Sequence, residues 1–130
     1  MSILTVEDET AVARLLALVL CGPKCKVVAA SDGSEALARI AASVRPFDIV
    51  ITDHKMPRMT GLELVRELRA QNFPGKIVVL SAFLDAENTR SYQALGVDLL
   101  LAKPFDMDEL RHAIEILADE APVYAQRATG

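Results

Sequence analysis

The sequence predicts an α/β fold, a doubly wound parallel sheet of five strands made from five successive strand–helix units, (βα)5. Three observations predict this fold. Five short apolar runs alternate with segments whose apolar residues recur at helical spacing. The runs are apolar throughout and do not alternate with polar residues, which indicates strands buried on both faces of a sheet. The length of 130 residues, 52% of them hydrophobic, suits one domain with its own core.

The strands are expected at the apolar runs, which are residues 2–6, 26–30, 47–52, 76–80 and 99–102. Each run has the length of an ordinary buried strand. The first run ends abruptly in acidic residues, and the fourth is the most continuous in β-branched side chains. These features favour strands over short buried helices.

The helices are expected after these runs, at residues 9–21, 34–42, 60–70, 85–95 and 106–120. The first helix has an apolar stripe that should face the sheet, formed by Val12, Leu15, Leu16 and Val19. Gly22 and Pro23 are typical of a helix end, and Asp32 with Gly33 turns the chain into the second helix.

Capping residues mark the starts of the later helices. The two capping-box pairs are Thr60 with Glu63 and Asp106 with Glu109. Asp85 is expected to cap the fourth helix, which Gly96 ends. Each apolar run is thus followed by a helix, so the strands should run parallel.

One domain is expected over residues 1–120, followed by a flexible tail or linker remnant at residues 121–130. The net charge of −4 and the lack of a Lys/Arg helix face in the sequence disfavour direct binding of nucleic acid. No apolar run is long enough to span a membrane, and acidic residues occupy positions 7–9, where a signal peptide needs apolar ones. We therefore expect a cytoplasmic protein without membrane contact.

Acidic side chains stand at the ends of two predicted strands. Glu7 and Asp8 follow the first strand, and Asp53 follows the third. An open parallel sheet binds its ligand outside the carboxyl ends of its strands, so these acids should converge there. Three carboxylates at one edge repel one another unless a cation lies between them. Because oxygen ligands without histidine suit hard cations, the sequence predicts a site for Mg²⁺ or Mn²⁺.

A hydroxyl and an ammonium group follow the other two strands at this edge. Ser81 comes after the fourth strand and Lys103 after the fifth. Together with the acids they make a set suited to phosphoryl transfer, in which a carboxylate attacks while a metal and a lysine neutralise phosphate oxygens. Asp53 is the best candidate nucleophile, because it lies centrally in the predicted sheet.

The motifs resemble those of the receiver domain of bacterial two-component response regulators, over residues 2–120. The matching segments are Val6-Glu7-Asp8-Glu9, Thr52-Asp53-His54-Lys55-Met56-Pro57-Arg58-Met59-Thr60-Gly61, Leu80-Ser81-Ala82, Gly96-Val97-Asp98 and Lys103-Pro104-Phe105. The resemblance implies a flavodoxin-like strand order of 2-1-3-4-5. It also implies a phosphoprotein that catalyses only its own phosphorylation and dephosphorylation, on Asp53, and is not an enzyme in the usual sense.

The resemblance further implies a role for each group at the strand ends. Mg²⁺ would be held by Asp8, Asp53 and the backbone carbonyl of Lys55, with Glu7 acting through a metal-bound water. Ser81 would bind a phosphoryl oxygen and Lys103 would pair with the phosphate. The Lys103-Pro104 bond is expected to be cis.

Three positions are expected to affect the switch or the lifetime of the aspartyl phosphate. Leu100 stands where most receivers carry a switching aromatic residue. Lys55 and Phe83 occupy the two positions that modulate how fast the aspartyl phosphate hydrolyses. We expect both side chains to slow hydrolysis, since neither resembles a polar residue that orients the attacking water.

The expected partners are a histidine kinase or histidine phosphotransfer protein, and a downstream protein that the sequence does not identify. A candidate docking face on the first helix comprises Ala11, Arg14 and Leu18. The protein would be a monomer or a phosphorylation-dependent dimer. Two alternatives remain open: a small Mg²⁺-dependent phosphatase with an Asp nucleophile, and a receiver module cut from a longer regulator or hybrid kinase.

Overall fold

The computed structural model describes residues 1–20, 25–82 and 84–119, and it contains the five-stranded parallel sheet that the sequence predicts. The strand order is β2-β1-β3-β4-β5, as the resemblance implied. The strands are β1 (Ser2–Val6), β2 (Lys26–Ala30), β3 (Ile49–Asp53), β4 (Lys76–Ser81) and β5 (Leu99–Ala102). All neighbouring pairs are parallel, so every strand ends at the same edge of the sheet.

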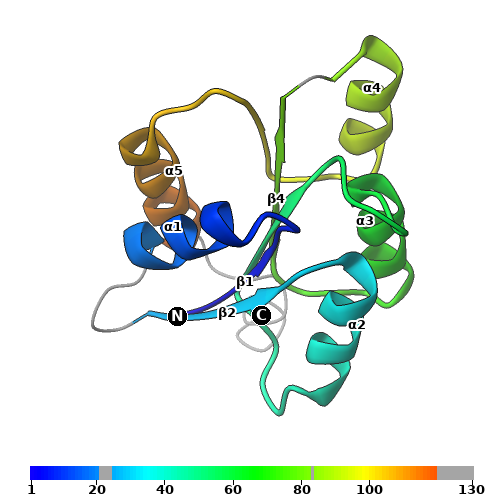
Figure 1. Ribbon diagram of the computed structural model, residues 1–130. Coiled ribbons are helices and arrows are strands. Elements are labelled where there is room, and N and C mark those ends of the chain that lie inside the picture. Colours follow the sequence, from blue (N-terminus) through cyan, green and yellow to red (C-terminus); the bar gives the residue numbers. More distant parts are fainter. Residues whose placement is uncertain (21–24, 83, 120–130) are drawn as a thin grey trace.

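Five helices cover the two faces of the sheet within the described ranges. They are α1 (Thr10–Leu20), α2 (Gly33–Ala42), α3 (Gly61–Ala70), α4 (Ala86–Ala94) and α5 (Met107–Asp119). Figure 1 shows α1 and α5 on one face, at the left of the view, and α2, α3 and α4 on the other. This is the doubly wound arrangement that strands apolar on both sides require.

Two hydrophobic clusters lie on opposite faces of the sheet. Leu4, Val50 and Val79 belong to the cluster under α2, α3 and α4. Ile3 and Val78, one residue earlier in their strands, belong to the cluster under α1 and α5. Successive strand residues point to opposite faces, so both sets must be apolar for both faces to be buried.

Side-chain caps start three helices where the sequence predicts them. Asp32 accepts a hydrogen bond from the Glu35 amide at 2.8 Å, and Asp85 accepts one from the Asn88 amide at 2.8 Å. At α3, the Thr60 hydroxyl accepts from the Glu63 amide at 3.2 Å. Each cap satisfies an amide that the first helical turn leaves without a backbone partner.

Several details of the predicted elements were wrong, including the end of the fourth strand, which contains Ser81. The third strand begins at Ile49 instead of residue 47, and it includes Asp53 as its last residue. Asp106 accepts a hydrogen bond from the amide of Asp108 at 2.9 Å, whereas the predicted capping box requires a bond from the amide of Glu109. Leu15 is 46% exposed, because it lies about 100° around α1 from buried Leu16, outside the stripe that faces the sheet.

The predicted helix end at Gly22 and Pro23 lies outside the described residues, as do the domain boundary at residue 120 and the tail at 121–130. None of the described helices has both the length and the apolar character needed to cross a membrane.

Candidate phosphoryl-transfer and metal site

Three carboxylates meet at the edge where the strands end. Glu7 and Asp8 follow β1, and Asp53 ends the adjacent strand β3. One carboxylate oxygen from each residue lies within 4.8 Å of the others. Pairing of Val6 with Thr52 in the sheet register brings these strand ends together, although the residues are far apart in sequence. The predicted convergence of the three acids is therefore confirmed.

Lys103 brings a positive charge to the carboxylates from the end of β5. Its ammonium nitrogen lies 3.2 Å from Oδ1 of Asp53 and 4.0 Å from Oε1 of Glu7. The Lys103-Pro104 bond is cis, as expected. The backbone amide of Lys103 donates to the carbonyl of Ser81 at 2.7 Å, so the ends of β4 and β5 are joined next to the acids.

Glu7 is the most buried of the three acids, with 4% of its surface exposed. Burial is the main cause that raises the pKa of Glu7 from 4.5 to about 7, and the negative charge of Asp53 raises it further. Its Oε1 is buried without a hydrogen-bond partner among the described residues. Such an oxygen, beside two further carboxylates, fits a divalent cation or a water bound to one.

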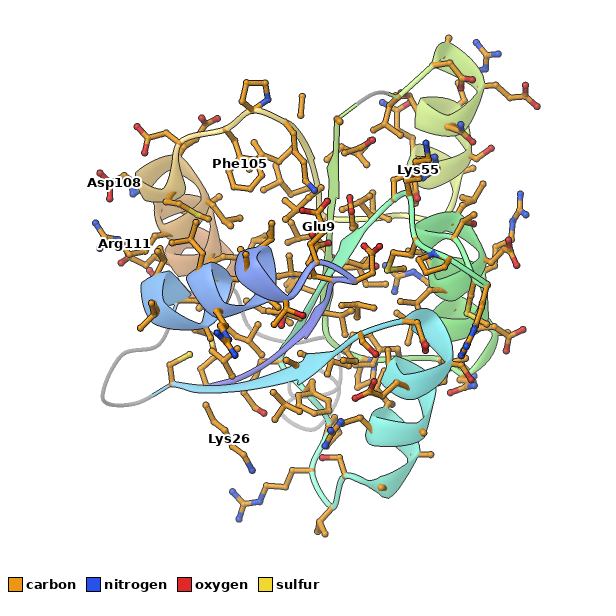
Figure 2. The ribbon with its side chains drawn as sticks, in the orientation of Figure 1. Glu9, Lys26, Lys55, Phe105, Asp108 and Arg111 are labelled. Atoms are coloured by element: carbon orange, nitrogen blue, oxygen red, sulfur yellow. The ribbon has the colours of Figure 1, made fainter. Side chains whose placement is uncertain are left out.

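The loop after β3 contacts the carboxylate of Asp53 through a backbone amide. The backbone amide of His54 donates to the carbonyl oxygen of Leu80 at 2.9 Å and also to Oδ1 of Asp53 at 3.0 Å. The side chain of Lys55 is exposed. Figure 2 shows Lys55 on the side of the sheet that carries α3 and α4, and Phe105 on the side that carries α5. The loops after β3 and β5 thus carry these two residues on opposite sides of the sheet (Figure 2).

Residues 3–115 match the response regulator receiver domain family. The chain belongs to this family. It is 33% identical to response regulator RppA of Synechocystis sp., over 95% of the chain and 53% of RppA. It is also 32% identical to transcription factor SKN7 of Chaetomium thermophilum, over 90% of the chain but only 16% of SKN7. The receiver domain thus spans about half, or less, of the length of these curated relatives.

Solved structures agree with this assignment. The chemotaxis protein CheY4 of Vibrio cholerae superposes with a TM-score of 0.80 at 30% identity, covering 89% of this chain and 97% of that protein. TrrA of Thermotoga maritima, solved in complex with Mg²⁺ and BeF, superposes with a TM-score of 0.77 at 32% identity, with the same coverage. The relatives are signalling regulators and not classical enzymes, and nothing in these comparisons favours the phosphatase alternative.

The positions expected to tune this receiver domain are only partly described. Leu100 is half-buried and packs against the cluster under α2, α3 and α4. Its strand neighbour in the register is Val79 on β4. Phe83 lies outside the described residues.

The candidate docking residues of the receiver domain lie together on the outer surface of α1. Ala11 and Arg14 are exposed, and Leu18 is 78% exposed. Leu15, which the sequence placed on the buried face, joins this surface. The apolar surface of α1 that is open to a partner is thus larger than expected.

One contact beside Asp53 was not predicted at all. Nδ1 of His54 and the hydroxyl of Tyr92 on α4 are hydrogen-bonded at 2.6 Å. Tyr92 is fully buried, although it lies in a helix of low overall hydrophobicity. Tyr92 is the single large hydrophobic side chain of residues 86–94, which is a signal for its burial but not for its partner.

Proposed function

We propose that this receiver domain accepts a phosphoryl group on Asp53 from a histidine kinase or histidine phosphotransfer protein and signals through contacts with other proteins. Receiver domains of response regulators are phosphorylated by histidine kinases. The observation that carries the assignment to Asp53 is its place at the centre of the charge cluster. Its carboxylate lies 3.2 Å from the Lys103 ammonium and within 4.8 Å of carboxylate oxygens of Glu7 and Asp8.

The proposed step moves the phosphoryl group between two side chains. An oxygen of the Asp53 carboxylate forms a bond to phosphorus while the bond between phosphorus and the donor's imidazole nitrogen breaks, and that nitrogen keeps the electron pair. Negative charge accumulates on the phosphoryl oxygens during transfer. The ammonium of Lys103 is close enough to pair with those oxygens once they are attached to Asp53.

The acidic cluster supports a magnesium site in the proposal. Asp8, Asp53 and the backbone carbonyl of Lys55 would ligate the ion, and buried Glu7 would reach it through a water. Mg²⁺ or Mn²⁺ would supply neutralising charge to the phosphoryl oxygens. Without the ion, Lys103 is the one described cation close to the three carboxylates. An anionic donor would then be repelled by the remaining negative charge of the site.

The remaining residues of the proposed site act after the phosphoryl group has been transferred to Asp53. Ser81, at the end of β4, would bind a phosphoryl oxygen through its hydroxyl. Lys55 would hold phosphoryl oxygens, and Phe83 would keep ordered water away, so both would slow hydrolysis. Leu100 fills space in the core without an aromatic ring to move. In this proposal the protein catalyses only its own phosphorylation and dephosphorylation.

The docking face proposed for the kinase or phosphotransfer protein is the outer surface of α1, centred on Leu18. Residues 1–120 form the receiver domain, and residues 121–130 a tail or linker. This division is supported by the family match over residues 3–115. The downstream partner is a protein, and the receiver is a monomer or a phosphorylation-dependent dimer without direct contact to nucleic acid.

Acetyl phosphate tests the proposed reaction without any kinase. With Mg²⁺ present, label from acetyl phosphate should become bound to the protein, and EDTA should abolish the labelling. p-Nitrophenyl phosphate, incubated in parallel, should not be turned over repeatedly. Catalytic hydrolysis of that ester without labelling of the protein would favour the phosphatase alternative.

A further inference from the structure

Among the described residues, few contacts attach helix α4 to the rest of the fold. Tyr92 is the buried residue of its nine positions, and the other side chains are mostly polar. The C-terminal end is held from α3, where Arg69 donates to the carbonyls of Leu95 at 2.7 Å and Gly96 at 2.8 Å. A helix held at one end and by one buried side chain has few contacts that resist a shift of its N-terminal half.

The single buried side chain of α4 leads directly to the phosphorylation site. The Tyr92 hydroxyl and Nδ1 of His54 are 2.6 Å apart, with the two rings in an edge-to-face arrangement. The backbone amide of His54 in turn donates to Oδ1 of Asp53 at 3.0 Å. Two hydrogen bonds, joined through His54, therefore connect the carboxylate of Asp53 with Tyr92 in the C-terminal half of α4.

The surroundings of the Tyr92 hydroxyl leave it little freedom to move. A Cβ atom placed on Gly61 would lie 3.0 Å from this hydroxyl, 2.9 Å from Cα of His54 and 2.4 Å from the carbonyl oxygen of Asp53. Glycine at position 61 thus allows the start of α3 to lie close to both His54 and Tyr92. Close packing on this side would favour transmission of a displacement of His54 to Tyr92.

The charge of Asp53 acts on Tyr92 as well. Burial raises the pKa of the Tyr92 hydroxyl, and the negative charge of Asp53 raises it further. The hydroxyl is therefore within electrostatic reach of the carboxylate. A phosphoryl group on Asp53, together with the proposed Mg²⁺, would change the distribution of charge near the hydrogen bond between Tyr92 and His54.

Strand β5 offers no comparable connection through position 100. Leu100 has neither a ring nor a hydroxyl, but it packs against the same hydrophobic cluster that contains Tyr92. In this cluster, the aromatic ring with a hydroxyl is that of Tyr92 on α4 and does not come from β5. We propose that the hydrogen bond between Tyr92 and His54 couples occupancy of Asp53 to the position of α4, an inference that rests on the proposed function.

The test compares amide and histidine-ring NMR shifts of the full chain before and after addition of Mg²⁺ with beryllofluoride. In the wild type, amides near Asp8, Asp53 and Lys103 should shift, as should those of residues 86–94 and the ring nitrogens of His54. Tyr92→Phe keeps the ring but removes the hydroxyl. It should retain the shifts at the site and lose most of those in α4, a reduction of about threefold or more.

Two matched comparisons separate coupling from a general effect on folding. Ser91→Ala removes a neighbouring α4 hydroxyl, which bonds the Glu87 carbonyl at 3.1 Å, and should leave the α4 response intact. His54→Asn keeps a polar atom near the position of Nδ1 and should preserve much of the response. His54→Phe should lose it, and this pair decides the matter if Tyr92→Phe does not fold.

The outcomes distinguish the inference from the function on which it rests. If beryllofluoride shifts no amides near Asp8 and Asp53 in the wild type, the proposed function fails and the inference fails with it. If those shifts occur but α4 does not respond, or responds equally in the wild type, Tyr92→Phe and His54→Phe, only the inference is overturned.

Discussion

The ammonium nitrogen of Lys103 lies 3.2 Å from Oδ1 of Asp53 but 4.0 Å from Oε1 of Glu7, so it compensates the two carboxylates unequally. Glu7 is also the more buried of the two. Burial and the charge of Asp53 together raise the pKa of Glu7 to about 7, in spite of the nearby lysine. Without a divalent cation, ionisation of Glu7 therefore opposes folding.

The first prediction concerns the stability of the metal-free protein against pH. Below pH 4.5 Glu7 is protonated in both the folded and the unfolded state, and its contribution to stability is fully present. As the pH rises from 4.5 toward 7, the unfolded state releases this proton more readily than the folded state, and the contribution is lost. In EDTA, the thermal midpoint should fall across this interval. Glu7→Gln, which stays neutral, should reduce the fall, and an identical pH profile in both proteins would contradict the account.

The second prediction compares two glycines that each begin a helix after a capping residue. A Cβ on Gly61 would meet the Asp53 carbonyl oxygen at 2.4 Å, whereas one on Gly33 would meet the flexible end of Met59 at 2.6 Å. Gly61→Ala should cost about 1–3 kcal/mol in the free energy of unfolding, because backbone must move. Gly33→Ala should cost less, since the Met59 side chain can adjust. Urea denaturation measures both, and equal losses would show that the backbone contact is unimportant.

The sequence was sufficient to predict the sheet and the meeting of the charged residues. Parallel strands place their carboxyl ends at one edge, so Asp8, Asp53 and Lys103 were expected at that edge once the strand–helix alternation was recognised. The strand order that brings them close was implied by the family resemblance. Leu15 shows where periodicity fails, because a residue at the margin of an apolar stripe has no fixed burial. The predicted end of the third strand was wrong by one residue, because the sequence pattern allows Asp53 either to end the strand or to follow it.

The link between His54 and Tyr92 could not be predicted from sequence. Residues 86–94 have no apolar stripe, so periodicity does not show which face of α4 is buried. The partner of His54 depends on how the loop after β3 approaches that helix, which local propensity does not determine. Only the three-dimensional packing brings these side chains together, across 38 positions of sequence.

The third prediction concerns docking on α1. Leu18→Glu should slow phosphotransfer from the cognate kinase by about fivefold or more, since loss of a residue central to an interface costs more than about 1 kcal/mol. Labelling by acetyl phosphate should not change. Val44→Glu is the matched control, because Val44 is 99% exposed but lies after α2, away from α1. Slowing of both donors by Leu18→Glu would refute the docking assignment.

The fourth prediction concerns the lifetime of the phosphoryl group. Lys55→Asn should speed its loss by about two- to fivefold, because an exposed cation holding an anion contributes up to about 1 kcal/mol. Combining it with Phe83→Glu should speed the loss further, since a polar side chain there can orient water. Lys26→Asn changes an exposed lysine of β2 and should have no effect. The decay of label after removal of acetyl phosphate measures all four proteins; an unchanged rate in the double variant would contradict the prediction.

The central claim, that Asp53 is the phosphoacceptor and needs a divalent cation, is tested most directly by the intact mass of the protein after treatment with acetyl phosphate. With Mg²⁺ the wild type should gain the mass of one phosphoryl group, and so should Asp108→Asn, which changes an exposed acid of α5. Neither Asp53→Asn with Mg²⁺ nor the wild type in EDTA should gain it. A phosphoryl group still acquired by Asp53→Asn would contradict the assignment.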